Sequence, residues 1–211
     1  MEKYFDRLEK EPLIAERWKK IEELESYGIK AFGSKYDKQI MIGDILKHNP
    51  EENLKFKTAG RIMSLRGKGK VYFAHIEDQS GKIQIYIKKD ELGENEFDHI
   101  VKMLNVGDII GVEGELFVTH TEELTLRVKS ISLLTKNVRS LPEKYHGLTD
   151  VEIRYRKRYV DLIMNPEVRD TFIKRTQIIK AVRKYLDDRG FLEVETPLMH
   201  PILGGAAAKP F

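Results

Sequence analysis

The segment VYFAHIEDQSGKIQIYI, residues 71–87, carries the pattern on which the fold prediction rests. Polar and apolar residues alternate on both sides of Ser80–Gly81, which predicts two β-strands joined by a tight turn. In the first strand Tyr72, Ala74 and Ile76 share one face, so Phe73 falls on the opposite face, among polar neighbours. The alternation therefore predicts a phenylalanine outside the core.

The alternating pattern extends beyond this hairpin. Strands are predicted near residues 57–65, 71–78, 82–87, 109–118 and 125–134, and a helical stretch, NEFDHIVKML, lies between the third and fourth strands. Turns rich in Gly and Asp/Asn separate most of the strands. Five strands with a helix after the third are the layout of an OB-fold β-barrel.

Helices are predicted on both sides of the barrel. The segment AERWKKIEELESY, residues 15–27, has apolar residues at helical spacing and predicts an N-terminal helix. After the barrel, Leu141–Pro142 and His146–Gly147 indicate a linker, and DVEIRYRKRYVDLIM predicts a helix. A second helix is predicted from Pro166 to about Arg189, and after it comes a predicted short strand, FLEVETPLM.

These elements predict four parts. They are an N-terminal helical extension (1–53), an OB-fold (54–138), a linker (139–150) and a C-terminal α+β part (151–211).

The composition favours a cytoplasmic protein. The chain has 211 residues, of which 41% are hydrophobic, and it has no cysteine, which excludes disulfides and thiolate metal sites. The formal net charge of +3 is too small to identify a nucleic-acid partner by itself. No apolar run approaches the roughly 18 residues of a membrane span. The six histidines lack zinc-binding spacing, and we expect neither a catalytic residue nor a metal site in this chain.

The predicted barrel offers a site for single-stranded nucleic acid. OB-folds bind such strands through a positive groove and aromatic platforms, and Phe73 has the position of a platform. Gln84 lies on the adjacent strand, where its amide can pair with the edge of a base. Arg66 and Glu123 are further candidates for contacts to phosphate, base or sugar. Four residues add positive charge: Lys68, Lys70, Lys82 and Arg127.

Each candidate also has an ordinary interpretation. Phe73 is a core residue if its strand twists or bulges. Gln84 taken alone is a surface residue, Arg66 is a solvated turn charge and Glu123 is a hairpin residue. The combination of Phe73 and Gln84 on neighbouring strands favours the binding site.

Several segments resemble class II lysyl-tRNA synthetases. HGLTDVEIRYRKRYVDLIMN is similar to the family's linker and first catalytic-domain helix, and FLEVETPLM…GGAAAKPF resembles its first class-defining motif and the residues after that motif. The barrel segments TAGRIMSLRGKGKVYFAHIEDQSGKIQIYI and VGDIIGVEGELFVTHTEELTLRV match as well. Aspartyl- and asparaginyl-tRNA synthetases share the barrel and FLEVETP, whereas the linker run and GGAAAKPF favour lysine.

The resemblance implies roles for individual residues. Phe73 matches the position that stacks on the central uridine of the lysine anticodon, while Gln84 and Glu123 match positions that hydrogen-bond there. Arg66 matches an anticodon contact, and Gly204 resembles a glycine of the lysine pocket. The helix after Pro166 and the strand around residues 194–197 are implied to form a homodimer interface.

The resemblance also implies that this chain is part of a larger enzyme. The parent would attach lysine to tRNA with ATP and Mg²⁺, whose binding motifs are expected beyond Phe211, so we expect this chain to be inactive alone. A stand-alone single-stranded nucleic-acid binder, a regulatory synthetase paralogue and a purely structural dimerisation piece remain as alternatives.

Overall fold

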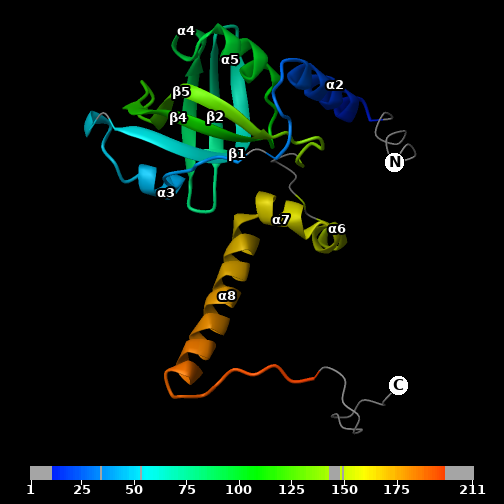
Figure 1. Cartoon of the computed structure of the whole chain (residues 1–211), viewed down its shortest axis with the longest axis vertical. Coiled ribbons are helices and arrows are strands. Elements are labelled where there is room, and N and C mark those ends of the chain that lie inside the picture. Colours follow the sequence, from blue (N-terminus) through cyan, green and yellow to red (C-terminus); the bar gives the residue numbers. More distant parts are fainter. Residues whose placement is uncertain (1–10, 34, 53, 143–147, 149, 198–211) are drawn as a thin grey trace. The chain divides into compact units, whose positions relative to one another are not determined.

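The computed structural model describes residues 11–33, 35–52, 54–142, 148 and 150–197 (Figure 1). It divides into two compact units, Met1–Leu141 and Pro142–Phe211. The strands are β1 (Lys55–Lys68), β2 (Val71–Glu77), β3 (Lys82–Lys88), β4 (Ile109–Val118) and β5 (Leu124–Thr135). The first unit also contains α2 (Pro12–Ser26), α3 (Ile42–Ile45), α4 (Lys89–Leu92), α5 (Glu94–His99) and the short 3₁₀ helices η1 (Pro50–Glu52) and η2 (Val101–Met103). The second unit contains α6 (Val151–Arg156), α7 (Arg158–Met164) and α8 (Pro166–Asp187).

The five strands close into a barrel in the order β1-β2-β3-β5-β4. All neighbouring pairs are antiparallel except β3 and β5, which run parallel. Inward-facing side chains fill the barrel, among them Ile62, Ile76, Ile85, Ile110 and Leu126, each fully buried. The predicted OB-fold is confirmed, and the strand bounds differ from the predicted ones by three residues at most.

Strand β1 contains a bulge that sets the outer face of the barrel. Ile62 pairs with Ile76, but the next regular pair is Ser64 with His75, so Met63 is an extra residue. Because side chains alternate along a strand, this extra residue turns Ser64 and Arg66 to the outer face. Arg66 therefore lies directly opposite Phe73.

The turn between β2 and β3 is held by Asp78. Its Oδ1 atom accepts hydrogen bonds from the backbone N–H groups of Ser80 (2.7 Å) and Gly81 (3.1 Å). Its Oδ2 atom accepts from Lys38 Nζ (2.6 Å) and from the backbone N–H of Ile42 (2.9 Å). This carboxylate joins the hairpin predicted at Ser80–Gly81 to the start of α3.

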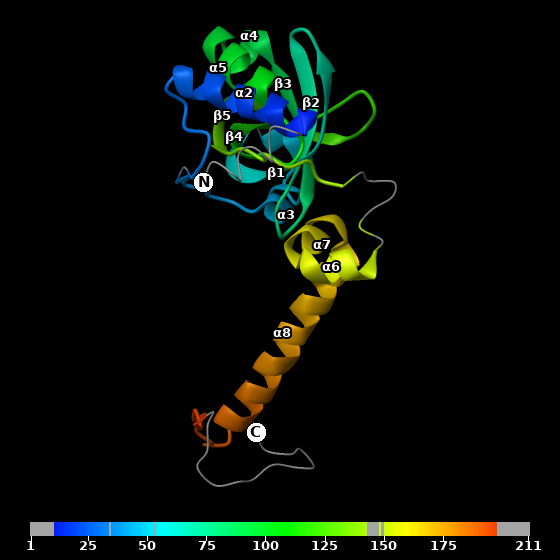
Figure 2. The same ribbon diagram turned by 90° about the vertical axis from the view of Figure 1, so that its right-hand side faces the viewer.

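Helices pack against the barrel from two parts of the sequence (Figures 1 and 2). Phe97 of α5 is fully buried and meets the ring of Tyr72 edge-on, with centroids 5.8 Å apart. Leu24 of α2 belongs to the same core, and Tyr27 after α2 stacks on His99 at 4.0 Å. The N-terminal helix is thus part of the barrel unit.

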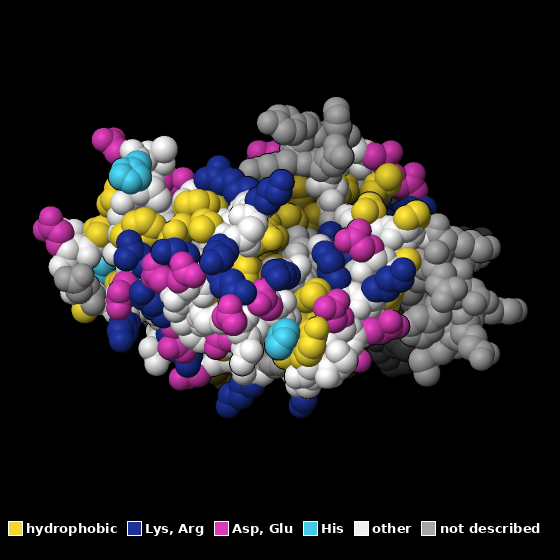
Figure 3. Space-filling model, turned by 90° about the horizontal axis from the view of Figure 1, so that it is seen from above, with side chains coloured by type: hydrophobic (Ala, Val, Ile, Leu, Met, Phe, Trp, Pro, Cys, Tyr) yellow, Lys and Arg dark blue, Asp and Glu magenta, His cyan; other side chains and the backbone are white. Residues whose placement is uncertain are grey.

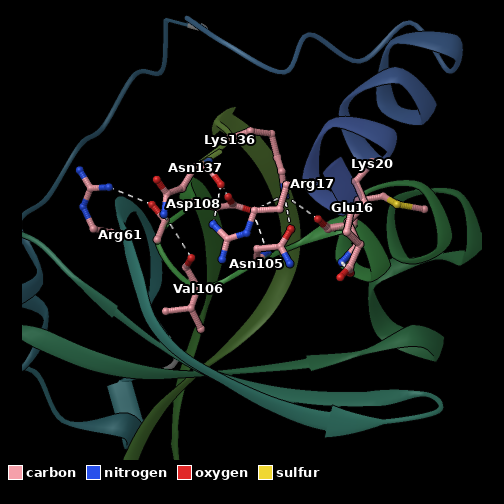
Figure 4. A network of polar contacts seen from close by, with 11 residues as sticks. Glu16, Arg17, Lys20, Arg61, Asn105, Val106, Asp108, Lys136 and Asn137 are labelled. Atoms are coloured by element: carbon pink, nitrogen blue, oxygen red, sulfur yellow. Dashed lines mark hydrogen bonds and ion pairs between the residues drawn. The ribbon is translucent and has the colours of Figure 1, made fainter. Parts of the chain in front are cut away.

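A buried polar network links α2 to one end of the barrel (Figure 4). Lys136 Nζ lies 2.6 Å from Asp108 Oδ2, and both side chains are 0% exposed. Burial lowers the pKa of Lys136, although the Asp108 carboxylate opposes that shift. The next residue, Asn137, donates its backbone N–H to Asp108 and accepts from Arg17 of α2 at 2.6 Å.

The second unit is helical and leaves its apolar side chains in contact with solvent. Asp150 caps α6 by accepting from the backbone N–H of Ile153 at 2.9 Å. Asp161 is the only buried residue among those described in this unit, and its carboxylate binds Arg154, Arg158 and Asn165. Helix α8 buries none of its described residues.

Two sequence predictions for this unit are wrong. The single helix predicted after Asp150 is two helices, because the backbone of Lys157 leaves helical geometry at φ −118° and ψ 50°. The strand predicted at FLEVETP is irregular at residues 191–197, because the described residues provide no neighbouring strand to pair with it. No helix in the described part of the chain is long and apolar enough to cross a membrane.

Candidate nucleic-acid interface

The barrel register builds two rows of side chains on the outer face of the sheet. The first row follows the pairs Arg66–Phe73, Phe73–Tyr86 and Tyr86–Arg127. The second row follows the pairs Ser64–His75, His75–Gln84 and Gln84–Thr125. Core residues occupy the alternate positions of the two strands, so both rows point away from the barrel interior. They are Ala74 and Ile76 in β2 and Ile83, Ile85 and Ile87 in β3.

The first row is a platform of aromatic rings between two arginines. The rings of Phe73 and Tyr86 have centroids 5.0 Å apart, and Phe117 of β4 continues the row at 5.7 Å from Tyr86. The guanidinium of Arg66 lies 5.6 Å from the Phe73 ring, and that of Arg127 lies 4.6 Å from the Phe117 ring. Phe73 is half-buried and is not among the core residues. A nucleic-acid base can stack on the Phe73 ring, and the neighbouring arginines can contact its phosphate.

The second row is a continuous chain of polar contacts. His75 Nε2 lies 2.8 Å from Glu123 Oε1, and His75 Nδ1 lies 2.9 Å from Ser64 Oγ. The other carboxylate oxygen of Glu123 accepts a hydrogen bond from the Gln84 amide. The Gln84 carbonyl oxygen accepts from Thr125 Oγ1 at 3.3 Å. Glu123 therefore bridges His75 and Gln84.

Glu123 reaches this row from the hairpin loop between β4 and β5. Its backbone N–H donates to Thr119 Oγ1 at 3.1 Å, and its carbonyl accepts from the Thr119 backbone N–H at 3.1 Å. Glu122 adopts a positive φ of 59°, which closes the loop. The loop thus places the Glu123 side chain, 40% exposed, over β3.

The structure brings four of the predicted site residues together and differs on one detail. Phe73 and Arg66 share the aromatic row, while Gln84 and Glu123 share the polar row. Alternation predicts that Gln84 is exposed, but it is only 2% exposed because Glu123 and Thr125 cover it. Gly204 lies outside the described residues.

Basic residues surround the platform. Arg66, Lys68, Lys70 and Lys82 are exposed, whereas Arg127 is half-buried. The Arg127 Nε atom is buried without a hydrogen-bond partner among the described residues. A hollow of about 400 Å³ adjoins it, lined by Glu115, Phe117 and their neighbours. In the face that Figure 3 shows, Lys and Arg side chains are interspersed with Asp and Glu, in keeping with a net charge of only +3.

The described residues contain no group of three or more His, Asp or Glu side chains that could hold a metal ion. No contact described in the candidate interface depends on a metal ion.

Sequence reasoning misses three residues of the interface. It treats His75 as one of several scattered histidines, and Tyr86 and Phe117 as ordinary strand residues. The parity of the strands indicates that His75 and Tyr86 share the face of Phe73. The contact of His75 with Glu123 depends on a loop fold that local alternation does not encode.

Comparison with known proteins matches both units. Residues 56–134 match the family described as OB-fold nucleic acid binding domain, and residues 150–211 match tRNA synthetases class II (D, K and N).

Longer relatives are similar along nearly the whole chain. The lysine–tRNA ligase of Fusobacterium nucleatum is 94% identical over 211 residues, which are 100% of this chain and 43% of the relative. That of Carboxydothermus hydrogenoformans is 52% identical over 200 residues, 94% of this chain and 41% of the relative. That of Staphylococcus aureus is 49% identical over 205 residues, 92% of this chain and 41% of the relative. The chain thus spans about two fifths of the length of these relatives.

Proposed function

The chain belongs to the class II tRNA synthetases, and from that premise we propose that its barrel recognises the anticodon of lysine tRNA. The observation that carries this proposal is the pair of rows on β1, β2, β3 and β5. The first row offers rings on which a base can stack, and the second row, beside it, offers hydrogen bonds to the edge of a base. Recognition of single-stranded RNA uses both kinds of contact.

The two rows have different tasks in this proposal. The Phe73 ring stacks on the central base, and Arg66 beside it contacts a phosphate or a second base. Gln84 and Glu123 read the base edge, because the amide offers a donor and an acceptor and the carboxylate offers acceptors. Since Gln84 and Glu123 already bind each other, the base has to replace or extend that contact.

Binding of short RNA stem-loops tests this function. We expect the chain to bind a stem-loop with the lysine anticodon more tightly than a loop that differs only by cytidine at the central position. Titrations at two stated salt concentrations separate base recognition from phosphate attraction, because the phosphate contribution falls steeply with salt. Equal affinity for both loops at both salt concentrations would contradict anticodon recognition.

A generic single-stranded nucleic-acid binder is the second candidate. The small net charge of +3 argues against it, because sequence-independent binding depends mainly on phosphate contacts. The stem-loop comparison decides between the two, since a generic binder responds to salt and ignores the central base.

The activity of the longer relatives leads to a proposal for the parent protein. We propose that it attaches lysine to tRNA using ATP and Mg²⁺, while this chain supplies anticodon binding and does not aminoacylate alone. Formation of lysyl-adenylate by the purified chain would contradict the last point. The apolar face of α8 is proposed as part of a homodimer interface, and Gly204 as part of the lysine pocket.

A further inference from the structure

His75 stands at the centre of the polar row. It lies between Ser64 and Gln84 in the strand register and points to the same side as both. Its ring is half-buried, with 22% of the side chain exposed. A histidine in that position is able to orient the groups on either side.

Both ring nitrogens of His75 have partners, which fixes the tautomer. An ionised carboxylate only accepts hydrogen bonds, so the contact of 2.8 Å to Glu123 places a hydrogen on Nε2. In a neutral ring Nδ1 then accepts from the Ser64 hydroxyl, 2.9 Å away. Ser64 therefore sets the ring so that its donor faces Glu123.

The Glu123 side chain depends on this contact for its position. It extends from a hairpin loop, and a free Glu side chain has about 1.5–2 kcal/mol of rotamer entropy to lose on ordering. His75 holds one carboxylate oxygen and Gln84 approaches the other, so the two oxygens face different neighbours. Without His75, only Gln84 would restrain the carboxylate among the described side chains.

We propose that His75 is a positioning residue that sets the base preference of this interface, an inference that rests on the proposed anticodon recognition. A fixed carboxylate accepts from the N3–H of uridine, whereas N3 of cytidine carries no hydrogen. The same carboxylate orients the Gln84 amide, so one imidazole determines the direction of both reading groups. His75 itself does not contact the base.

A double-mutant cycle tests this role by the ratio of affinities for two stem-loops that differ only by uridine or cytidine at the central position. Loss of a hydrogen bond to a charged group predicts that His75→Leu lowers this ratio roughly tenfold. His75→Gln keeps a donor to Glu123 and should retain the ratio within about threefold. When Glu123→Ala is already present, His75→Leu should change the ratio less than about twofold, because coupled residues are not additive.

Ser64→Ala keeps His75 but removes its anchor, and it should lower the ratio by an intermediate amount. Contacts outside the central base serve as an internal control, because a loop that lacks this base should bind wild type and His75→Leu equally. This control also separates a misfolded variant from a repositioned carboxylate.

The outcomes distinguish the proposed function from the role of His75. If wild type shows no preference between the loops, the proposed anticodon recognition fails. If wild type prefers uridine and His75→Leu keeps that preference, only the role of His75 is overturned. Effects of His75→Leu and Glu123→Ala that simply add would also overturn it, because His75 would then act independently of the carboxylate.

Discussion

The two units of the chain use their apolar residues in opposite ways. In the barrel unit, isoleucines, Phe97 and leucines form one buried cluster behind a closed sheet. In the helical unit, α8 carries Phe172, Ile178 and Val182 at 43%, 64% and 56% exposure. A closed barrel satisfies its own strand edges and core, whereas an exposed apolar helix face is typical of a surface that binds other protein.

This difference predicts that the folding stability of the chain resides in the barrel unit. The single tryptophan, Trp18, lies on α2 and reports on that unit alone by fluorescence. Circular dichroism of the helices reports on both units. A change in one unit can therefore be compared with a matched change in the other.

The largest expected effect is a loss of folding stability when a buried phenylalanine is replaced. The same substitution at an exposed phenylalanine is its control. Phe97→Ala leaves a cavity in the core and should lower the free energy of unfolding by about 3–5 kcal/mol. Phe172→Ala should change it by about 0.5 kcal/mol or less. Denaturant unfolding measures the first variant by Trp18 fluorescence and the second by circular dichroism, and similar losses would break the contrast between the units.

RNA binding should show the next largest effect. Phe73→Ala removes a stacking surface and should weaken stem-loop binding by about 1–3 kcal/mol. The free energy of unfolding should hardly change, because Phe73 lies outside the core. Phe172→Ala is the matched control and should bind RNA as wild type does. Unfolding of the Phe73 variant would instead identify that ring as structural.

Acid should weaken the barrel unit through Asp78. Burial opposes the charged form, but hydrogen bonds from Ile42, Lys38 and Ser80 outweigh it and lower the pKa of Asp78 from 3.8 to about 2. A carboxyl group whose pKa is depressed by folding stabilises the protein above its unfolded pKa. That contribution, about 1–2 kcal/mol, is lost as pH falls from about 4 to about 2.

Asp78→Asn tests the contribution of the ionised carboxylate, because an asparagine side chain does not titrate. The stability difference between wild type and the variant should shrink as the pH approaches 2, as measured by urea unfolding at several pH values. Asp170→Asn, at an exposed position of α8, is the control and should give a difference independent of pH. A constant difference for Asp78→Asn would show that its hydrogen bonds do not depend on ionisation.

The smallest effect is expected from shortening the chain. A protein that ends at Leu141 retains the barrel unit with its buried Asp108–Lys136 pair. Its free energy of unfolding should stay within about 0.5 kcal/mol of the value for the whole chain, because all residues of the buried apolar cluster belong to the barrel unit. A loss above about 1 kcal/mol would show that the helical unit stabilises the barrel.

Sequence alone predicts the barrel because each of its strands shows a local pattern of alternating polar and apolar residues. Alternation around Ser80–Gly81 and the helix containing Phe97 identify strands and connections whatever their partners. The break at Lys157 and the irregular FLEVETP segment are not predictable in this way. A strand requires a neighbour, and a propensity pattern does not indicate whether one is present.

The candidate site also has features that the sequence predicts and features that it does not. The position of Phe73 outside the core follows from strand parity. The burial of Gln84 and the role proposed for His75 arise from Glu123, which is 39 residues from Gln84 in sequence and reaches it through the fold of a loop. Periodicity describes each strand separately, whereas the contact between Gln84 and Glu123 joins strand β3 to the loop between β4 and β5.

The extra residue in β1 has a consequence for how this surface changes during evolution. Deleting Met63 would restore regular pairing and leave Ser64 opposite His75 and Arg66 opposite Phe73, because Ser64 would then follow Ile62 directly. An inserted residue would instead shift Ser64 and Arg66 away from these partners, unless the bulge held a second extra residue. Single-residue deletions at the bulge should therefore be tolerated better than insertions there. In a relative without the bulge, an arginine one position nearer to the residue aligned with Ile62 is equivalent to Arg66.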